Sequence, residues 1–420
     1  MVRMSLWIVG ALVILGVCAW LLFVILQTDK KTTIYSNSRV HFWRTTSIDT
    51  SKYSRDLARE KLNDSSFDTI IEEQVRNIAE TGATHVSINT PYDEEFVPYL
   101  TRWVEAARRH NINVWFRGNW SGWEEWFDYQ RIFRDEHISK TEKFILAHRD
   151  LFKDGDIFTP CPECENGGPG DPRHNNDVVG HREFLIKEYS MTKSTFEVIG
   201  KSVRSNYNSM NADVARVVMD PLTTSALGGV VAVDHYVESP IEFARDVAEI
   251  ATSSKGDIVV GEFGAPIPDI HGSMSAATQA AWIESALFEL TKMPHVVGVN
   301  YWTAVGGSTE IWNSKMIARL AVDVLKNFYK PLKVNGFVKD ELDRPIANAK
   351  ISTKLREIRA DQYGYFELPY YPKGDLTIEV EASGHSSTNS LISKPNQQFE
   401  IILVKTNKSM FDRFFDFIRL

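Results

Sequence analysis

Carboxyl side chains follow two apolar runs of the chain, where they could act together on one substrate. Glu262 comes directly after IVVG in DIVVGEFGAP, and Glu163 and Glu165 come shortly after a second run in GDIFTPCPECENGG. Cleavage of a glycosidic bond requires two carboxyl groups, one ionised to attack and one protonated to donate. We therefore take Glu262 and Glu163 as the candidate catalytic pair, with Glu165 as the alternative to Glu163.

Other polar and aromatic residues follow further apolar runs and are candidates for holding the substrate. They are Arg117, Asn119 and Trp120 in WFRGNW, Asn166 after Glu165, His235 and Tyr236 in VVAVDHY, and Trp302 in GVNYW. Each also has a structural interpretation, since a tryptophan or histidine can pack in the core and an arginine can pair with a nearby carboxylate.

The elements that must position these residues alternate in type between residues 38 and 330. We predict eight strands at Arg39–Trp43, Thr84–Asn89, Asn113–Arg117, Asp156–Pro160, Ala215–Met219, Val230–Asp234, Asp257–Gly261 and Val296–Tyr301. Amphipathic helical patterns such as FDTIIEEQVRNIAE lie between them. Eight such units predict a (β/α)8 barrel at residues 31–331, in which active groups gather at the C-terminal ends of the strands. The first strand has no glycine-rich phosphate turn, which disfavours a doubly wound sheet.

These residues resemble the retaining glycoside hydrolases of clan A, in particular the family-five cellulases and mannanases. The run V-G-E-F-G around Glu262 is similar to the nucleophile segment of that clan, and Glu163 stands where its acid/base follows the fourth strand. His235-Tyr236 and Trp302 match the clan's positions on strands six and eight. The resemblance implies a sugar substrate and no cofactor or metal.

One position departs from the clan. An asparagine normally precedes the acid/base and binds the sugar 2-hydroxyl, but here Pro162 precedes Glu163. Asn166 and Asn119 are the alternatives for that role.

Residues 5–26 carry no charge and, as a helix, would reach about 33 Å, enough to cross a bilayer. We predict an uncleaved membrane anchor at residues 1–30, with a cleaved signal peptide as the alternative. A polysaccharide substrate would place the barrel outside the cytoplasm, so we expect a single-pass protein of the cell membrane.

Residues 332–405 alternate apolar and polar side chains with period two, which predicts a small antiparallel β-sandwich. The segments V-N-G-F-V, P-I-A-N-A-K-I and D-Q-Y-G-Y-F resemble a carboxypeptidase regulatory-like domain. The remaining residues 406–420 form an amphipathic pattern, which predicts a tail that packs on the sandwich, lies on a membrane or stays disordered.

The net charge of −8 and the lack of a basic block argue against a nucleic-acid partner. Cys161 and Cys164 are half of a zinc site at most, and either a disulfide or two free thiols fit their spacing. Two other functions stay open. One is a catalytically silent barrel that binds glycans as an envelope scaffold. The other is a metal-dependent hydrolase that uses the loop residues Asp171, His174, Asp177 and His181.

Overall fold

The computed structural model describes residues 41–353, 357–371, 376–392 and 398–406 of the 420-residue chain. The predicted anchor at residues 1–30 and, apart from Thr406, the predicted tail at residues 406–420 lie outside these ranges. Within the described ranges, no helix is long and apolar enough to cross a membrane.

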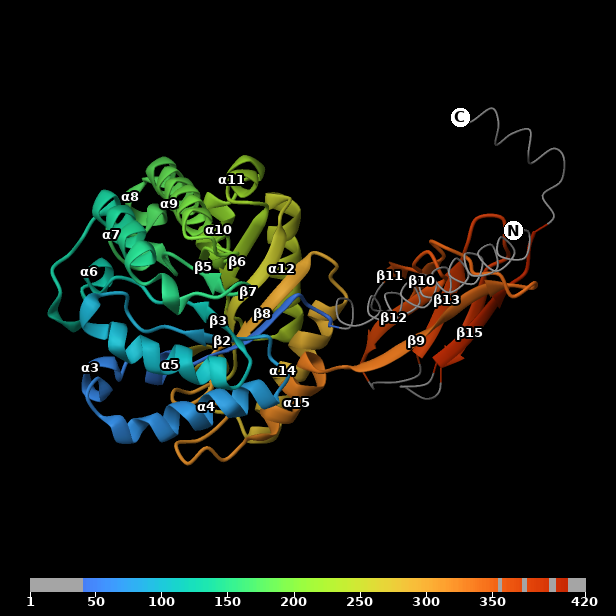
Figure 1. Ribbon diagram of the computed structural model, residues 1–420, viewed down its shortest axis with the longest axis horizontal. Helices are drawn as coiled ribbons and strands as arrows, with labels where there is room; N and C mark the ends of the chain where they lie inside the picture. Colours follow the sequence, from blue (N-terminus) through green and yellow to red (C-terminus); the bar gives the residue numbers. More distant parts are fainter. Residues whose placement is uncertain (1–40, 354–356, 372–375, 393–397, 407–420) are drawn as a thin grey trace, which may run out of the picture. The chain divides into compact units, whose positions relative to one another are not determined.

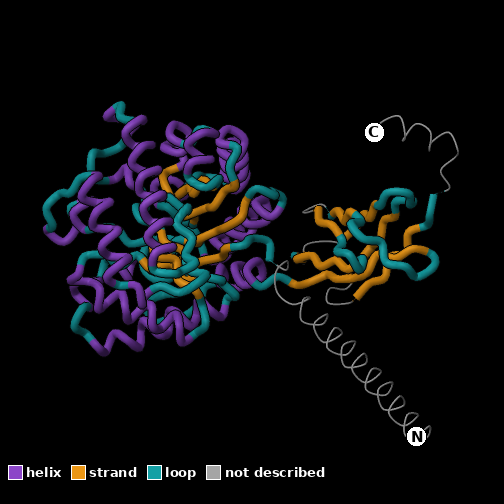
Figure 2. The backbone as a smooth tube through the Cα atoms, turned by 45° about the horizontal axis from the view of Figure 1, so that its top comes forward, coloured by secondary structure: helices purple, strands orange, loops and turns teal. Residues whose placement is uncertain are grey.

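Eight parallel strands form one curled sheet with helices around it (Figure 1, Figure 2). Their order is β4-β3-β2-β1-β8-β7-β6-β5, and the segment before β5 closes the ring. There Ile157 pairs with Arg204, and the Phe158 amide donates to the Arg204 carbonyl over 2.8 Å. The predicted (β/α)8 barrel is confirmed. Its strands are β1 Thr45–Asp49, β2 His85–Ile88, β3 Asn113–Phe116, β4 Ile157–Phe158, β5 Ser209–Asn211, β6 Val230–Asp234, β7 Asp257–Phe263 and β8 Val296–Tyr301.

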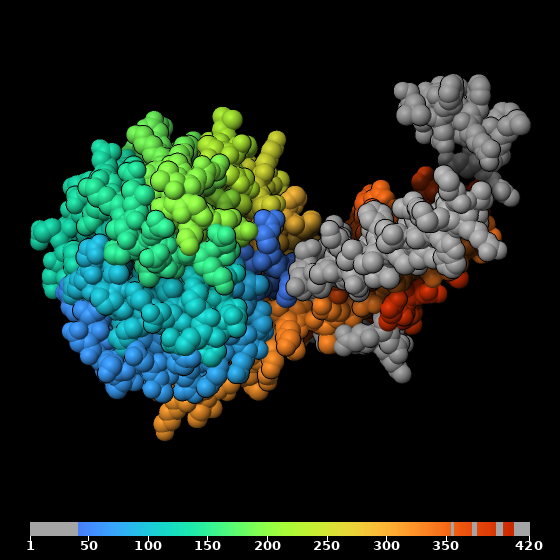
Figure 3. Space-filling view, viewed as in Figure 1, coloured from blue at the N-terminus to red at the C-terminus, as the bar shows by residue number. Residues whose placement is uncertain are grey.

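Helices follow the strands, and the longer ones bury an apolar stripe, as α4 does with Ile71, Val75 and Ile78. In the space-filling view their side chains cover the strands (Figure 3). The α-helices are α2 Ser51–Ser54, α3 Ala58–Lys61, α4 Asp68–Glu80, α5 Val97–Arg109, α6 Ser121–Glu124, α7 Arg134–Ala147, α8 Pro172–Asn175, α9 Val178–Val198, α10 Ala212–Val218, α11 Pro221–Ala226, α12 Pro240–Ser254, α13 Pro268–His271, α14 Ala276–Thr291 and α15 Leu320–Tyr329. Short 3₁₀ turns are η1 Ser65–Phe67, η2 Glu94–Phe96, η3 Trp126–Asp128, η4 Arg149–Leu151 and η5 Cys164–Asn166.

Two predicted strands are wrong. Ala215–Met219 was expected to be the fifth strand, but Ala212–Val218 forms helix α10, and the strand is the short polar segment Ser209–Asn211. The first strand is Thr45–Asp49 and begins two residues after Trp43. Both true strands are polar yet buried, because their side chains are hydrogen-bonded inside the barrel, as Thr45 is to Tyr207 over 3.2 Å.

The C-terminal residues form two small sheets with a shared apolar core. One sheet has the order β11-β10-β13-β14 and the other the order β12-β9-β15. Alternate residues of β9 and β13 are buried, as the period-two pattern predicts, and Val334, Ile351 and Ile378 join one core from both sheets. The assignment to a carboxypeptidase regulatory-like domain stays a prediction. The strands are β9 Leu332–Asp340, β10 Lys350–Ser352, β11 Glu357–Arg359, β12 Tyr365–Tyr370, β13 Leu376–Glu381, β14 Thr388–Ile392 and β15 Gln398–Leu403.

Candidate active site

Three carboxyl groups meet at the C-terminal ends of the barrel strands. Glu262 lies within β7, Asp234 ends β6, and Glu163 lies in the loop after β4. One carboxylate oxygen of each lies within 4.8 Å of the others. The two glutamates singled out from the sequence therefore belong to one site.

The guanidinium of Arg117, just after β3, holds this group of acids together. It lies 2.9 Å from Asp234 Oδ2, 3.0 Å from Glu262 Oε1 and 3.4 Å from Asp49 Oδ2. It also donates to the Ser209 hydroxyl over 3.0 Å. Burial opposes its charge, but the three carboxylates raise the pKa of Arg117 above its ordinary value. Arg117 is thus a fixed cation inside the barrel mouth.

Gly261 lets β6 and β7 approach each other closely at this point. A Cβ atom at this position would collide with the Asp234 carboxylate. The Gly261 carbonyl accepts hydrogen bonds from Arg117 Nη1 and from the Asn300 side chain, each at 2.8 Å. The lack of a side chain at position 261 therefore leaves room for the Asp234 carboxylate beside Glu262.

Each oxygen of the Glu262 carboxylate faces a donor group. The Tyr236 hydroxyl donates to its Oε2 over 2.8 Å, and Arg117 lies at its Oε1. Burial raises the pKa of Glu262 to about 7, and the Glu163 carboxylate adds to that shift, whereas Arg117 and Tyr236 oppose it. Both donors favour the ionised form, which is the form that can attack.

Glu163 has a different environment. Its Oε2 accepts a hydrogen bond from Asn166 Nδ2 over 3.0 Å, and no cation of the described residues lies within ion-pair distance of it. Burial and then the Glu165 carboxylate raise the pKa of Glu163, while Arg117 opposes the shift. These surroundings favour a proton on Glu163, as a general acid needs.

Glu165 is engaged with the protein backbone. Its Oε1 accepts from the Asn211 amide over 2.7 Å and from Asn211 Nδ2 over 3.0 Å. Asn211 precedes α10, so the Glu165 carboxylate ties the loop after β4 to the start of that helix. This contact favours Glu163 over Glu165 as the acid/base.

Asp234 and Asp49 are parts of the site that the sequence reasoning did not select. Asp49 accepts from Asn89 Nδ2 at 2.9 Å and from the Ser87 hydroxyl at 3.0 Å, besides its contact with Arg117. Both aspartates are the last residues of buried strands. The last residue of a buried barrel strand is a position that indicates a site residue in the sequence. For Asp49 this indication is absent, because the predicted first strand ends at Trp43.

His235 does not face the carboxyl groups. Its Nε2 lies 2.9 Å from Asp246 Oδ2 on α12, and its ring stacks on Phe243 at 5.8 Å. Burial lowers the pKa of His235, although Asp246 opposes the shift. The histidine fastens β6 to α12 and also lines a cavity together with Asp234 and Tyr236, so its contact with substrate stays a prediction.

Asn119 and Trp120 are likewise turned into the protein. Asn119 is fully buried, and its Oδ1 accepts from the Trp120 amide over 2.8 Å and faces His137 Nε2 at 3.0 Å. The Trp120 indole donates to Thr141 over 2.9 Å. Both side chains are bonded within the protein, so their contact with substrate stays a prediction, whereas Asn166 donates directly to Glu163.

Trp302, directly after β8, lies next to Tyr236, the residue that donates to Glu262. It is partly exposed, its indole donates to the Ser51 hydroxyl over 3.0 Å, and its ring meets Tyr236 edge-on at 6.2 Å. Because Tyr236 also bonds Glu262, the aromatic ring and the carboxylate are linked through one side chain. The ring can serve as a platform for a sugar.

The barrel is similar in fold to solved structures of GH5_18 proteins. The GH5_18 protein from Streptomyces cattleya in complex with GlcNAc aligns with a TM-score of 0.53 at 14% identity, over 72% of this chain and 85% of that one. GH5_18 from Bifidobacterium longum subsp. longum, in complex with Manb1-4GlcNAc, aligns with a TM-score of 0.52 at 11% identity, over 72% and 84%. The similarity shows a common fold. No family model and no curated protein matches the chain.

Of the four residues considered as metal ligands, the two aspartates cap helices and the two histidines lie within α8 and α9. Asp171 caps α8 and pairs with Arg173, and Asp177 caps α9. His174 is exposed, and burial lowers the pKa of His181 to about 4. Among the described residues, the one cluster of three potential ligands is that of Glu163, Asp234 and Glu262, where Arg117 already supplies the positive charge.

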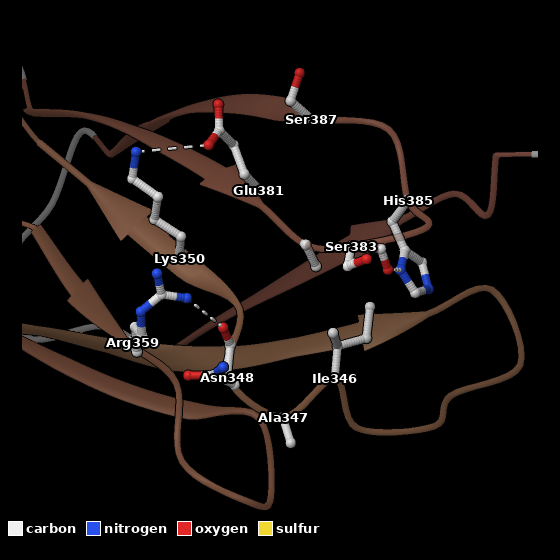
Figure 4. Close-up of a pocket in the computed structure, with 10 residues that line it drawn as sticks. Ile346, Ala347, Asn348, Lys350, Arg359, Glu381, Ser383, His385 and Ser387 are labelled. Atoms are coloured by element: carbon white, nitrogen blue, oxygen red, sulfur yellow. Dashed lines mark hydrogen bonds and ion pairs between the residues drawn. The ribbon is translucent and has the colours of Figure 1, made fainter. Parts of the chain in front are cut away.

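Two cavities differ in their relation to the carboxyl groups. One of about 420 Å³ is lined by Asp234 and Tyr236 together with Asn211, Arg173 and Arg216. A larger one of about 600 Å³ lies within the C-terminal sheets (Figure 4), where its lining includes Lys350, Arg359, Asn348, His385 and Glu381. The smaller cavity is also lined by His235 and Asp246. It adjoins the candidate catalytic pair through Asp234, which has a carboxylate oxygen within 4.8 Å of oxygens of Glu163 and Glu262, and through Tyr236, which donates to Glu262.

Proposed function

We propose that the chain is a retaining glycoside hydrolase that cleaves β-glycosidic bonds of an extracellular or cell-envelope polysaccharide. Glu262 is its nucleophile and Glu163 its acid/base. The observation that carries this proposal is the approach of their carboxylate oxygens to within 4.8 Å. Retaining enzymes hold the two carboxyl groups about 5–5.5 Å apart, whereas inverting enzymes leave about 6.5–9.5 Å for a water molecule.

In the first step, a Glu262 oxygen attacks the anomeric carbon while the bond to the leaving oxygen breaks. Glu163 transfers its proton to that oxygen, so the leaving group departs as a neutral alcohol. Arg117 and Tyr236 hold Glu262 ionised until it attacks. The product is a glycosyl ester of Glu262.

In the second step, Glu163 is a carboxylate and removes a proton from water. The water oxygen attacks the anomeric carbon, the ester bond to Glu262 breaks, and both glutamates return to their first states. Two inversions at one carbon give overall retention.

Substrate contacts come from side chains around this pair. Trp302 supplies a ring face, and Asn166 beside Glu163 is the candidate for the sugar 2-hydroxyl. The complexes of the two similar barrels with GlcNAc and Manb1-4GlcNAc support a saccharide as the ligand class.

The proposed location is the outer side of a cell membrane, with residues 5–26 as the anchor. A disulfide between Cys161 and Cys164 supports it, since disulfides persist mainly in oxidising compartments.

The test uses the full-length protein in detergent with a panel of aryl β-glycosides. The hydrolysis of any hit is followed by proton NMR, and the β-anomer is expected as the first product. If the α-anomer appears first, the mechanism is inverting. If the panel and natural glycans bind without turnover, the protein is a glycan-binding scaffold.

A further inference from the structure

A disulfide closes a four-residue ring around the candidate acid/base. Cys161 lies three residues after β4, Cys164 begins η5, and a covalent bond joins them across Pro162 and Glu163. Both cysteines are buried, at 0% and 2% exposure. The ring therefore sits in the protein interior, and Glu163 extends from it toward Glu262.

The backbone of Glu163 adopts a left-handed conformation, with φ 45° and ψ 50°. Few residues other than glycine adopt this conformation, and it persists where the surroundings impose it. No long helix or strand supplies that support, because β4 has two residues and η5 has three.

Three hydrogen bonds fix the ring from outside. The Glu163 amide donates to the Ser209 carbonyl over 2.8 Å, and the Glu163 carbonyl accepts from the Asn166 amide over 2.9 Å. The Trp123 indole donates to the Cys164 carbonyl over 3.1 Å. These hydrogen bonds fix single main-chain atoms of Glu163 and Cys164. The disulfide instead fixes the distance between Cys161 and Cys164, which limits the conformations open to the turn that contains Glu163.

We propose that the Cys161–Cys164 disulfide positions the Glu163 carboxyl for proton donation, an inference that rests on the proposed function. Opening the ring lets the residue leave its left-handed conformation, which moves the carboxyl away from the leaving oxygen. The cysteines are positioning residues, since they act through Glu163 and do not touch the reacting atoms.

The test compares the full-length protein with its Cys161→Ser, Cys164→Ser double variant on aryl β-glycosides of graded leaving-group acidity. A poor leaving group needs the proton of Glu163, whereas a good one departs without it. We expect the double variant to lose about 10-fold or more in the glycosylation rate with poor leaving groups and to keep it with good ones. An equal loss on every substrate, or no loss on any, overturns the proposal.

A second comparison places the same double substitution in a Glu163→Ala background. If the disulfide acts through Glu163, it adds no further loss there, because the carboxyl that it positions is already gone. An additive loss overturns the proposal. A Glu163→Ala variant that itself shows no dependence on leaving group contradicts the proposed function instead, so the two failures are distinguishable.

If the double variant does not fold, reduction of the folded wild-type protein answers the same question. A water-soluble phosphine converts the disulfide to two thiols and becomes a phosphine oxide, the oxygen and the two protons coming from water. Thiol titration measures the fraction of protein whose disulfide is reduced, after the thiol of Cys18 has been subtracted. The selective loss with poor leaving groups should appear on reduction and disappear on reoxidation. A rate unchanged by complete reduction overturns the proposal.

Discussion

Arg117 and Glu262 form an ion pair at the barrel mouth, with 3.0 Å between Nη1 and Oε1. The same guanidinium also contacts Asp234 at 2.9 Å, so one buried cation pairs with both Glu262 and Asp234. Removing it would leave negative charges facing each other in a site with little water. The state of Glu262 should therefore depend on Arg117.

Arg117→Met is expected to move the acidic limb of the kcat/KM–pH profile to higher pH. Glu262 must be ionised to attack, and without the cation its pKa, already raised to about 7 by burial, rises further. We also expect the free energy of unfolding to fall by about 3–5 kcal/mol. Arg109→Met is the control, because the Arg109 side chain is 54% exposed and pairs with Glu72 at the surface. It should cost about 0–1 kcal/mol and leave the pH profile unchanged. An unshifted acidic limb in Arg117→Met would contradict this role.

Glu124→Gln should stabilise the protein at alkaline pH. Burial raises the pKa of Glu124 to about 8, with the Glu163 carboxylate adding to the shift and Arg55 opposing it. The folded state then binds a proton that the unfolded state releases, so wild-type stability falls as the pH rises from about 4.5 to 8. Glutamine carries no titrating group. The free energy of unfolding of the variant, relative to that of the wild type, should therefore grow by at most about 1.4 kcal/mol per pH unit over that range. Urea denaturation at pH 5 and pH 8.5 measures it. Glu125→Gln, at the exposed next position, serves as the control, and an equal pH trend in both variants would refute the assignment.

His235→Ala tests whether the histidine supports the fold or binds the sugar. Its hydrogen bond to Asp246 predicts a loss of about 1–3 kcal/mol in the free energy of unfolding, with KM nearly unchanged. Asp246→Asn, which weakens the same contact from the other side, should behave alike. A raised KM at unaltered stability would instead return His235 to the substrate-binding residues.

Trp302→Ala should raise KM for the sugar by removing the ring face beside Tyr236. Loss of a contact aromatic costs about 2 kcal/mol in many interfaces, or roughly 30-fold in affinity. Trp302→Phe keeps a flat ring and should recover most of the affinity. Steady-state kinetics and sugar titrations measure both, and equal KM values for the alanine variant and the wild type would exclude the platform role.

The sequence predicts the barrel where strands are apolar on consecutive residues. VVAVD forms β6 as predicted, and β7, which contains Glu262, has the same apolar pattern over residues 258–260. The prediction fails at Thr45–Asp49 and Ser209–Asn211, where polar side chains form hydrogen bonds inside the barrel. A polar segment of this kind has the sequence pattern of a loop. The burial of such a strand depends on partners from other strands, which no local pattern contains.

For the site, the alternation of side chains along a strand is a further signal in the sequence. Successive side chains of a strand point to opposite faces, so Asp234 and Tyr236 share one face while His235 faces the helices. The structure follows this alternation, since Arg117 contacts Asp234 and Glu262 contacts Tyr236. The Cys161–Cys164 disulfide has no such signal in the sequence, because a separation of three residues fits two free thiols as well as a disulfide.

The measurement that tests the central claim most directly is the anomeric configuration of glycosyl azides formed by two alanine variants. Glu163→Ala lacks the proton donor but forms the Glu262 ester with an activated aryl β-glycoside, so azide should attack that ester and give the β-azide. Glu262→Ala lacks the nucleophile, so azide should enter its vacated side and give the α-azide. If Glu165→Ala gives the β-azide while Glu163→Ala behaves as wild type, the acid/base is misassigned. Wild-type turnover in both Glu163→Ala and Glu262→Ala would contradict the glycosidase mechanism itself.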